Sequence, residues 1–353
     1  MRIADWTIRL REDSHPRELM VEITTACNYA CPHCFRFSIK DFRTCYMDLK
    51  LYREVLNSAL DAGVEKITFS GWGEPTAHPD IIEIVEEAKK RGLVVVLNTN
   101  GSKLNELSAD LVRLGVDEVF VSISLPELNQ NTLQGLKHLR TQRILKRAEK
   151  PIIKAIYTVT KPSVRGVKEV VERVKELGVR EVYFNYYIPY PGGLEELDCL
   201  NDSKCREEFN RLLSDTTPKI LGAGIRFTHA EATPKFTRTC PFAANRALFV
   251  RCDGWVTPCL YYSRSWRTRV LGVTRDLSEV LLGRVGEISI TDIWRGKYAD
   301  MFFRLYFNYL PSCLECPFME GCRITSTNEA DCWGNAPNCA HCPYLHKLSY
   351  CPL

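Results

Sequence analysis

The distribution of cysteines constrains the fold of this chain more than any other feature of its sequence. Of the 16 cysteines in 353 residues, ten lie in the last 114 residues, and three stand near the start as Cys27-x3-Cys31-x2-Cys34. Cysteine is scarce in most proteins, and clusters with short fixed spacings serve ligation or reactivity rather than packing. Thiolates are the ligands of iron–sulfur clusters and of structural zinc. The spacing therefore predicts a protein built around metal at two separate places.

Composition and charge exclude several classes of protein. With 45% hydrophobic and 25% charged residues the chain is typical of a globular protein, and its net charge of +4 gives no case for a nucleic-acid or membrane partner. The basic stretch over residues 137–150 is typical of a solvated helix face rather than of a site for an acidic partner. The start of the chain lacks a signal peptide, and no apolar run is long enough to span a bilayer. We therefore expect a cytoplasmic metalloprotein without a disulfide framework.

Residues 20–215 alternate short β-rich runs with amphipathic helical runs. The expected strands cover residues 19–24, 66–70, 93–98, 118–124, 152–158 and 181–187, and the expected helices cover residues 49–62, 80–91, 104–114, 132–149 and 164–177. Such alternation predicts an α/β fold with a parallel sheet and right-handed crossovers. A closed eight-unit barrel needs about 250 residues. We therefore expect a partial, open (β/α)6 barrel of the TIM type over residues 1–215.

The pattern changes after residue 215. A loop-rich linker is expected over residues 216–239, followed by a small cysteine-rich domain over residues 240–353. In this domain, residues 247–251 and 255–259 predict a β-hairpin around an Asp-Gly turn pair, and residues 291–310 predict a helix. The remainder has little periodicity, so metal binding is expected to supply its folding free energy.

The first three cysteines directly follow the first predicted strand. Three thiolates on a four-iron cluster leave one iron without a protein ligand, and an open metal position is where a substrate or cofactor binds. Zinc, or a closed cluster with a distant fourth ligand, is the alternative. The next three strands end at the same edge of the sheet, where such folds bind ligands. The candidate ligand-binding residues at those strand ends are Gly73, Glu74, Asn100, Ser122 and Ser124.

Cys27-x3-Cys31-x2-Cys34 together with Gly73-Glu74-Pro75 resembles the radical S-adenosylmethionine (SAM) superfamily over roughly residues 18–215. The resemblance implies that the open iron chelates the methionyl amine and carboxylate of SAM. An electron from the reduced cluster then cleaves the sulfonium C–S bond, and the resulting 5′-deoxyadenosyl radical abstracts a hydrogen atom from the substrate.

Family contacts can be carried over to several of these residues. The resemblance implies that Gly73 and Glu74 touch the methionyl amine, and that Ser122 or Ser124 touches the carboxylate or ribose. Asn100, at the end of the third predicted strand, is a further candidate cofactor-binding residue. The chain departs from the family where Trp72 replaces the first glycine of the usual Gly-Gly-Glu, and where His33 replaces an aromatic residue. We expect His33 to pack or to donate a hydrogen bond rather than to bind metal.

From Cys240 onward the cysteine spacing resembles the SPASM domain, a C-terminal extension of radical SAM enzymes that holds two auxiliary four-iron clusters. The resemblance assigns Cys240, Cys259 and Cys332 to the first auxiliary cluster. It assigns Cys313, Cys316, Cys322 and Cys351 to the second. Together with the cluster that binds SAM, this makes three [4Fe-4S] clusters.

Several cysteines fall outside that template. Cys252, Cys339 and Cys342 have no counterpart in the template. Either one of these three cysteines completes the first auxiliary cluster, or that cluster keeps an open iron for substrate. The alternative is a zinc site made from Cys313-x2-Cys316 and Cys339-x2-Cys342. Ordinary thiols are expected at Cys45, Cys199 and Cys205.

SPASM enzymes mostly modify peptides or proteins, and two of their subfamilies fit poorly. Leu260 stands where sulfatase maturases place an aspartate base, and the chain lacks the Gly-Gly tail of the pyranopterin-precursor cyclases. Residues 331–344 instead resemble a subfamily of radical SAM proteins associated with tungsten-containing aldehyde ferredoxin oxidoreductase. These proteins are described as its cofactor-modifying proteins or maturases. This resemblance implies a tungsten-containing oxidoreductase, or less readily its tungstopterin, as substrate.

A low-potential electron donor such as ferredoxin is the other implied partner. The alternatives are a maturase that installs a thioether or carbon–carbon crosslink in another peptide, a multi-cluster electron-transfer protein, and a zinc scaffold without catalytic activity.

Overall fold

The computed structural model describes residues 2–3, 6–7, 14–39, 41–123, 130–235, 238–351 and 353, apart from the side chains of residues 2–3, 6–7 and 171. Its centre is a curved ten-stranded sheet of order β14-β11-β10-β3-β4-β5-β6-β7-β8-β9. The strands are β3 (Glu18–Val21), β4 (Lys66–Phe69), β5 (Val94–Thr99), β6 (Glu118–Ile123), β7 (Ile152–Val159), β8 (Glu181–Tyr186), β9 (Arg226–His229), β10 (Ala247–Val250), β11 (Trp255–Thr257) and β14 (Gly283–Arg284).

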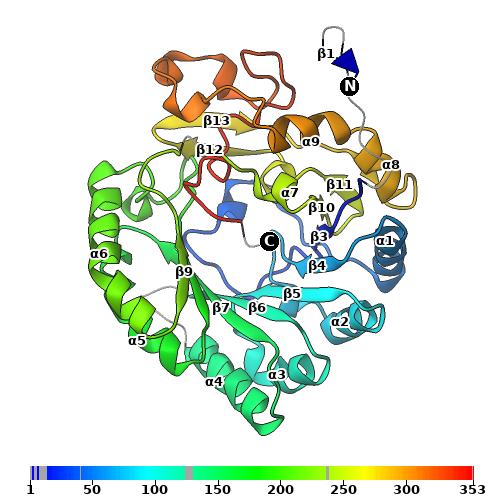
Figure 1. Ribbon diagram of the computed structural model, residues 1–353, viewed down its shortest axis with the longest axis vertical. Coiled ribbons are helices and arrows are strands. Elements are labelled where there is room, and N and C mark those ends of the chain that lie inside the picture. Colours follow the sequence, from blue (N-terminus) through cyan, green and yellow to red (C-terminus); the bar gives the residue numbers. More distant parts are fainter. Residues whose placement is uncertain are drawn as a thin grey trace.

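Six helices cover the outer face of this sheet (Figure 1). They are α1 (Leu49–Asp61), α2 (Ile81–Lys90), α3 (Leu104–Arg113), α4 (Gln130–Leu145), α5 (Val167–Glu176) and α6 (Ser203–Gly222). Every pair of neighbouring strands from β3 to β9 is parallel. The predicted partial barrel of six β/α units is thereby confirmed, and β9 adds a further strand to it.

Local sequence explains the units. On β5 the β-branched run Val95–Val96 and the following Leu97 are fully buried, as expected for a strand covered on both faces. The Asp48 side chain caps α1 by accepting from the Leu51 amide (2.8 Å). Gly63 follows α1 at φ +82°, a left-handed conformation that favours glycine.

The linker expected over residues 216–239 contains regular structure, because α6 continues to Gly222 and β9 follows. Pro218 lies inside α6, although proline normally stops a helix by removing one backbone donor. Two hydroxyl groups before it donate to backbone carbonyls, Thr216 to Leu212 (2.6 Å) and Thr217 to Leu213 (2.9 Å). The buried residues Thr216 and Ile220 hold the helix on the barrel, so that tertiary packing overrides the local signal. The division of the chain into two domains stays a prediction.

The C-terminal segment adds three helices and a two-stranded sheet near the cysteines. They are α7 (Pro241–Ala244), the two-stranded sheet of β12 (Trp266–Val270) and β13 (Val273–Leu277), and the helices α8 (Ile290–Arg295) and α9 (Ala299–Tyr306). The single helix predicted over residues 291–310 is therefore two helices. Gly296 ends α8, and its amide donates to the Asp292 carbonyl (2.8 Å). The predicted apolar face is buried on both helices, including Trp294 and Phe302.

The predicted hairpin of β10 and β11 does not stand apart from the barrel. β10 pairs in parallel with β3, with Ala247 opposite Glu18 and Val250 opposite Val21. The C-terminal segment therefore extends the sheet of the barrel through backbone hydrogen bonds. Within the described part of the chain, no helix is both long and apolar enough to cross a membrane.

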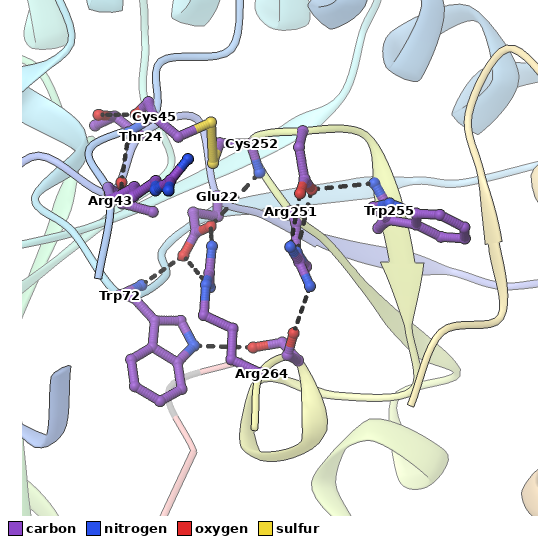
Figure 2. A network of polar contacts seen from close by, with 12 residues as sticks. Glu22, Thr24, Arg43, Cys45, Trp72, Arg251, Cys252, Trp255 and Arg264 are labelled. Atoms are coloured by element: carbon purple, nitrogen blue, oxygen red, sulfur yellow. Dashed lines mark hydrogen bonds and ion pairs between the residues drawn. A yellow bond between two sulfur atoms is a disulfide. The ribbon is translucent and has the colours of Figure 1, made fainter. Parts of the chain in front are cut away.

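A buried ion pair fastens this junction. The Glu22 side chain is fully buried at the end of β3, and both its oxygens accept from the guanidinium of Arg264, which lies between β11 and β12. The Trp72 amide donates to Glu22 Oε2 (2.8 Å), and the Trp72 indole N–H donates to Ser263 Oγ (2.8 Å). Figure 2 shows these contacts converging on Glu22 from three segments of the chain.

The junction predicts an unequal response to loss of arginines. Arg264→Ala leaves a buried carboxylate without its cation and should lower the free energy of unfolding by about 3–5 kcal/mol. The measurement is the thermal midpoint of the anaerobically purified protein. Arg165→Ala is the control, because the Arg165 side chain is 84% exposed in its ion pair with Glu208 and should change stability by less than about 0.5 kcal/mol. Equal effects of the two substitutions would contradict the role given to Glu22.

Candidate cluster and cofactor site

The three N-terminal cysteines lie on one loop between β3 and the short helix η1 (Phe35–Ser38). All three are free and partly exposed. The Cys34 amide donates to the Cys31 carbonyl (3.0 Å), which folds the loop into a turn. Burial and the nearby thiols of Cys34 and Cys27 raise the pKa of Cys31 to about 11, and Arg36 opposes this rise. Three thiolates so close together need a cationic partner, and an iron cluster bound to all three supplies one.

Glu74, which follows β4, lies buried behind this loop. Its Oε1 accepts from the hydroxyls of Thr76 and Thr99 (both 2.6 Å), and its Oε2 accepts from the Asn100 amide (2.6 Å). Burial raises the pKa of Glu74, and these hydrogen bonds oppose the rise. The carboxylate therefore ties the end of β4 to the end of β5. Since its oxygens already have partners, a contact between this segment and a ligand amine falls to the main chain of Gly73 and Glu74.

Gly73 stands where no side chain fits. A Cβ at this position would lie 2.4 Å from the Thr24 carbonyl oxygen and 2.6 Å from that of Ala26. The Glu74 amide also donates to the Ala26 carbonyl (2.7 Å). Gly73 thus lets the chain after β4 pack directly on the backbone that leads into Cys27.

Asn100 reaches the cysteine loop itself. Its Nδ2 lies 4.0 Å from Cys27 Sγ and donates to Asn28 Oδ1 (2.9 Å). Ser122 is exposed near the end of β6, at the edge of the sheet where Asn100 follows β5. Ser124 lies outside the described residues. Gly73, Glu74 and Asn100 are therefore brought to the cysteine loop, and the cofactor contacts of all five candidate residues stay predictions.

Sequence reasoning missed two tyrosines that follow β8. The rings of Tyr187 and Tyr190 lie 6.3 Å apart, and Tyr187 also contacts the ring of His33 edge-on at 6.5 Å. Burial raises the pKa of Tyr190, with a further contribution from Cys34. Through His33, the ring of Tyr187 lies next to the cysteine loop. The position of both tyrosines after the sixth strand, at the same edge as the other candidates, was the signal that could have identified them.

Trp72 stands where the family usually has a glycine. Its side chain packs in an aromatic cluster. Its ring contacts Phe35 edge-on at 4.5 Å and Trp266 at 5.7 Å. The Arg264 guanidinium lies 5.6 Å from the ring centroid of Trp72. The tryptophan therefore connects η1, directly after Cys34, with the start of β12.

The free C-terminal cysteines form two sets. The first set lies between α7, β11 and the C-terminal tail and comprises Cys240, Cys259, Cys339, Cys342 and Cys351. Burial raises the pKa of Cys259 well above its ordinary value, and Cys342, Cys339 and Cys240 raise it further. Burial likewise raises the pKa of Cys351, with Cys240 among its neighbours. These neighbouring thiols match the donor chemistry of an iron–sulfur cluster.

The second set comprises Cys313, Cys316, Cys322 and Cys332. Burial raises the pKa of Cys313 to about 12, and Cys332 and Cys322 are among the neighbours that add to the rise. The Cys316 amide donates to the Cys313 carbonyl (3.4 Å) on the same turn. Four thiols from one folded segment match the four ligands of a closed cluster.

This arrangement differs from the one implied by the SPASM resemblance. Cys332 lies with the second set and Cys351 with the first, the reverse of the implied assignment. The Tyr350 backbone pairs with the Asn185 side chain on β8 through two 2.9 Å hydrogen bonds, and Cys351 packs near Phe242 and Phe249. The tail is therefore held at the barrel, near Cys240. The zinc alternative loses its basis, because its two cysteine pairs fall into different sets.

Four cysteines are paired, which corrects the expectation of free thiols. Disulfides join Cys45 to Cys252 and Cys199 to Cys205, so the Cys252 thiol is not free to bind metal. The Thr24 hydroxyl donates to the Cys45 carbonyl (2.7 Å) and holds Cys45 beside β3. Pairing of β10 with β3 then brings Cys252 to the same place (Figure 2).

Single metal ions need tighter groups of ligands than clusters do. Among the described residues, no group of three or more His, Cys, Asp or Glu side chains could hold a metal ion. A four-iron cluster binds each thiolate through a different iron, so that its sulfur ligands lie further apart than those of a single ion.

Comparison with known families places this architecture. The chain belongs to the radical SAM superfamily, whose family model matches residues 21–198. A second model, SPASM, described as an iron-sulfur cluster-binding domain, matches residues 240–317. The protein is accordingly a radical SAM enzyme that modifies a protein or cofactor with SAM and a [4Fe-4S] cluster, and its SPASM region is of the kind that holds auxiliary clusters.

Two relatives align along nearly the whole chain. The tungsten-containing aldehyde ferredoxin oxidoreductase cofactor-modifying protein of Pyrococcus furiosus is 30% identical over 95% of this chain and 97% of its own length. The PqqA peptide cyclase of Gluconobacter oxydans is 26% identical over 95% of this chain and 93% of its own length.

Solved structures share the fold at lower identity. Streptococcus suis SuiB bound to S-adenosylmethionine superposes with a TM-score of 0.62 at 16% identity, over 88% of this chain and 73% of that one. The structure of anSMEcpe with bound AdoMet gives a TM-score of 0.61 at 17% identity, over 93% and 91% of the two chains. These similarities confirm the α/β barrel with its SPASM-like extension.

The close packing at Gly73 predicts loss of the N-terminal cluster in Gly73→Ala. The new methyl group would displace the backbone that leads into Cys27, so that iron and sulfide content should fall by about one four-iron cluster. The measurement is iron and sulfide analysis of anaerobically reconstituted protein. Gly222→Ala is the matched control, because nothing lies within 4 Å of a Cβ there. Full iron content in Gly73→Ala would show that the loop tolerates the displacement.

The cysteine pairing predicts different outcomes for two of the surplus cysteines. Cys252→Ser should keep the iron content of the unsubstituted protein, because its thiol is bonded to Cys45. Cys342→Ser should lower iron by up to about four atoms per chain, because it removes a thiol from the first set. Iron analysis with electron paramagnetic resonance (EPR) of the reduced protein measures both. The prediction fails for Cys252 if its substitution alone removes a cluster signal.

Proposed function

We propose that this protein matures a tungsten-containing aldehyde ferredoxin oxidoreductase, by modifying its polypeptide or its tungstopterin. The observation that carries the proposal is the 30% identity to the Pyrococcus furiosus cofactor-modifying protein along 95% of the chain. The distinctive segment over residues 331–344 supports it, since its cysteines contribute to both C-terminal sets. Cys332 belongs to the second set, and Cys339 and Cys342 belong to the first.

The N-terminal site supplies the radical chemistry. When SAM and the reduced cluster are bound, they provide a radical that abstracts hydrogen from the substrate. In this proposal, Cys27, Cys31 and Cys34 hold the cluster and leave one iron open. Gly73 and Glu74 offer main-chain carbonyl groups to the cofactor's ammonium group. The Glu74 carboxylate acts as a positioning group, because it holds the Asn100 amide 2.6 Å from its Oε2.

Two auxiliary clusters complete the proposed cofactor set. The second set supplies four thiols for one [4Fe-4S] cluster, and four of the five thiols in the first set hold another. Three clusters of four irons correspond to about twelve irons per chain.

A low-potential electron donor such as ferredoxin is the second proposed partner. Cys332 is exposed, and next to it the exposed ring of Trp333 contacts Tyr309 at 5.7 Å. The second set therefore reaches the protein surface, where an electron can enter from another protein.

A second candidate function is crosslinking of another peptide. It is favoured by the alignment with the PqqA peptide cyclase, which covers 95% of this chain. In this case the substrate is a precursor peptide, and the product contains a thioether or carbon–carbon bond. Both candidates require hydrogen abstraction at the N-terminal site and differ only in the substrate.

Anaerobic co-expression distinguishes these functions. The tungsten-containing oxidoreductase should show a changed peptide mass or a changed cofactor when it is produced together with this protein. Cys27→Ala is the control and should leave the oxidoreductase unmodified, because one cluster ligand is lost. If oxidoreductase peptides and cofactor are the same with both forms, the proposed substrate is wrong and precursor peptides become the next to test.

Formation of 5′-deoxyadenosine separates a radical SAM enzyme from an electron carrier. The reconstituted and reduced protein should cleave SAM, and Cys27→Ala should lower the rate to the background of free iron and sulfide. Chromatographic quantification of 5′-deoxyadenosine measures this directly. A multi-cluster electron carrier would contain similar iron and yield none of the nucleoside.

A further inference from the structure

Arg275 is a buried cation that the proposed chemistry has not yet used. It lies on β13, opposite Thr268 of β12, and its relative exposure is 0%. One terminal nitrogen donates to the carbonyls of Val270 (3.2 Å) and Val273 (3.3 Å). Its Nε and its other terminal nitrogen are buried and have no hydrogen-bond partner within the described residues. Buried donors of a charged group are rarely left unpaired, because the group loses its hydration without gaining a partner.

Arg275 lies close to two cysteines of the second set. The thiols of Cys313 and Cys322, both in the second set, lie within electrostatic range of the guanidinium, as do the hydroxyls of Tyr261 and Tyr262. Within the described part of the chain, no carboxylate forms an ion pair with Arg275. The charge of this arginine is therefore uncompensated as long as the nearby thiols are neutral.

Histidines near Arg275 cannot offset its charge, because an imidazole is either neutral or positively charged. An anionic group held by Cys313 and Cys322 is therefore the remaining source of negative charge beside Arg275.

We propose that Arg275 donates hydrogen bonds to the sulfur atoms of the cluster held by Cys313, Cys316, Cys322 and Cys332, and thereby raises its reduction potential. A cluster with four thiolate ligands is an anion, and each added electron makes it more negative. Hydrogen bonds and a nearby positive charge stabilise the reduced form more than the oxidised form. Arg275 is thus a positioning and tuning residue for an electron-accepting cluster. The step is a one-electron transfer from the donor protein, with no bond broken.

At the other cysteine set, the cations near Cys339 and Cys351 already have carboxylate partners among the described residues, and for Cys351 this cation is Lys66, paired with Glu18. Arg304 lies near Cys339, but its guanidinium is already paired with Asp300 (2.8 Å) and donates to the Ala336 carbonyl (2.7 Å). Its charge is therefore largely compensated. The two auxiliary clusters should accordingly differ in potential, with the second-set cluster the easier to reduce. An electron entering at exposed Cys332 would be held there first.

An EPR-monitored redox titration of the fully reconstituted protein tests this inference. The signal that disappears in Cys322→Ala identifies the second-set cluster. Arg275→Met should lower the midpoint potential of that signal and leave the other clusters unchanged. Arg275→Gln, which keeps an N–H donor but removes the charge, should give a smaller shift in the same direction. The matched control is Arg267→Met on β12, where the side chain is 59% exposed in its pair with Asp276, and no potential should change.

Each possible result of the titration either supports or overturns the role of Arg275. An unchanged potential in the Arg275 variant that keeps its iron overturns the inference. Loss of iron from the second set alone in both variants also overturns it, because Arg275 would then be needed to build the site rather than to set its potential. The inference rests on the proposed auxiliary clusters. If the unsubstituted protein shows no signal that depends on Cys322, the proposed cofactor set fails, which is distinct from failure of the role of Arg275.

Discussion

The buried ion pair between Glu22 and Arg264 joins the two chemical halves of the protein. Glu22 stands at the end of β3, five residues before Cys27, and Arg264 follows the segment that contains Cys259. Trp72 donates its amide to the same carboxylate and its indole N–H to Ser263. Displacement of any of these groups would shift the cysteine loop and the auxiliary region together. Buried polar contacts therefore hold the barrel mouth and the C-terminal segment together.

Local patterns predicted much of the fold. The six β/α units are confirmed because each reflects a local rule, such as the buried β-branched run of β5 and the capping aspartate of α1. The hairpin is confirmed for the same reason. Continuation of α6 through Pro218 could not be predicted, because packing of Thr216 and Ile220 on the barrel outweighs the missing hydrogen bond. The break between α8 and α9 at Gly296 was not predicted, because the buried apolar face continues across both helices.

The site shows the same contrast between local and distant information. The cysteine loop, Gly73 and Asn100 were predicted because motif spacing and strand ends are local. The structure groups Cys332 and Cys351 differently from the implied assignment, because the position of Cys351 depends on a tail anchored by Asn185. The disulfide partner of Cys252 was missed for a similar reason, because it requires the pairing of β10 with β3. Arg275 had no sequence signal, as its importance lies in donors left unpaired by folding.

Pairing of β10 with β3 also has a consequence for biosynthesis. Residues 18–21 and 247–250 are neighbours in the sheet, although more than two hundred residues of chain separate them. While the ribosome makes those residues, β3 has an open edge and unpaired backbone groups, a template for association with other chains. Closure of that edge waits for synthesis of the cysteine-rich segment. The emerging chain therefore needs protection from aggregation, and its iron is best inserted after the sheet has closed.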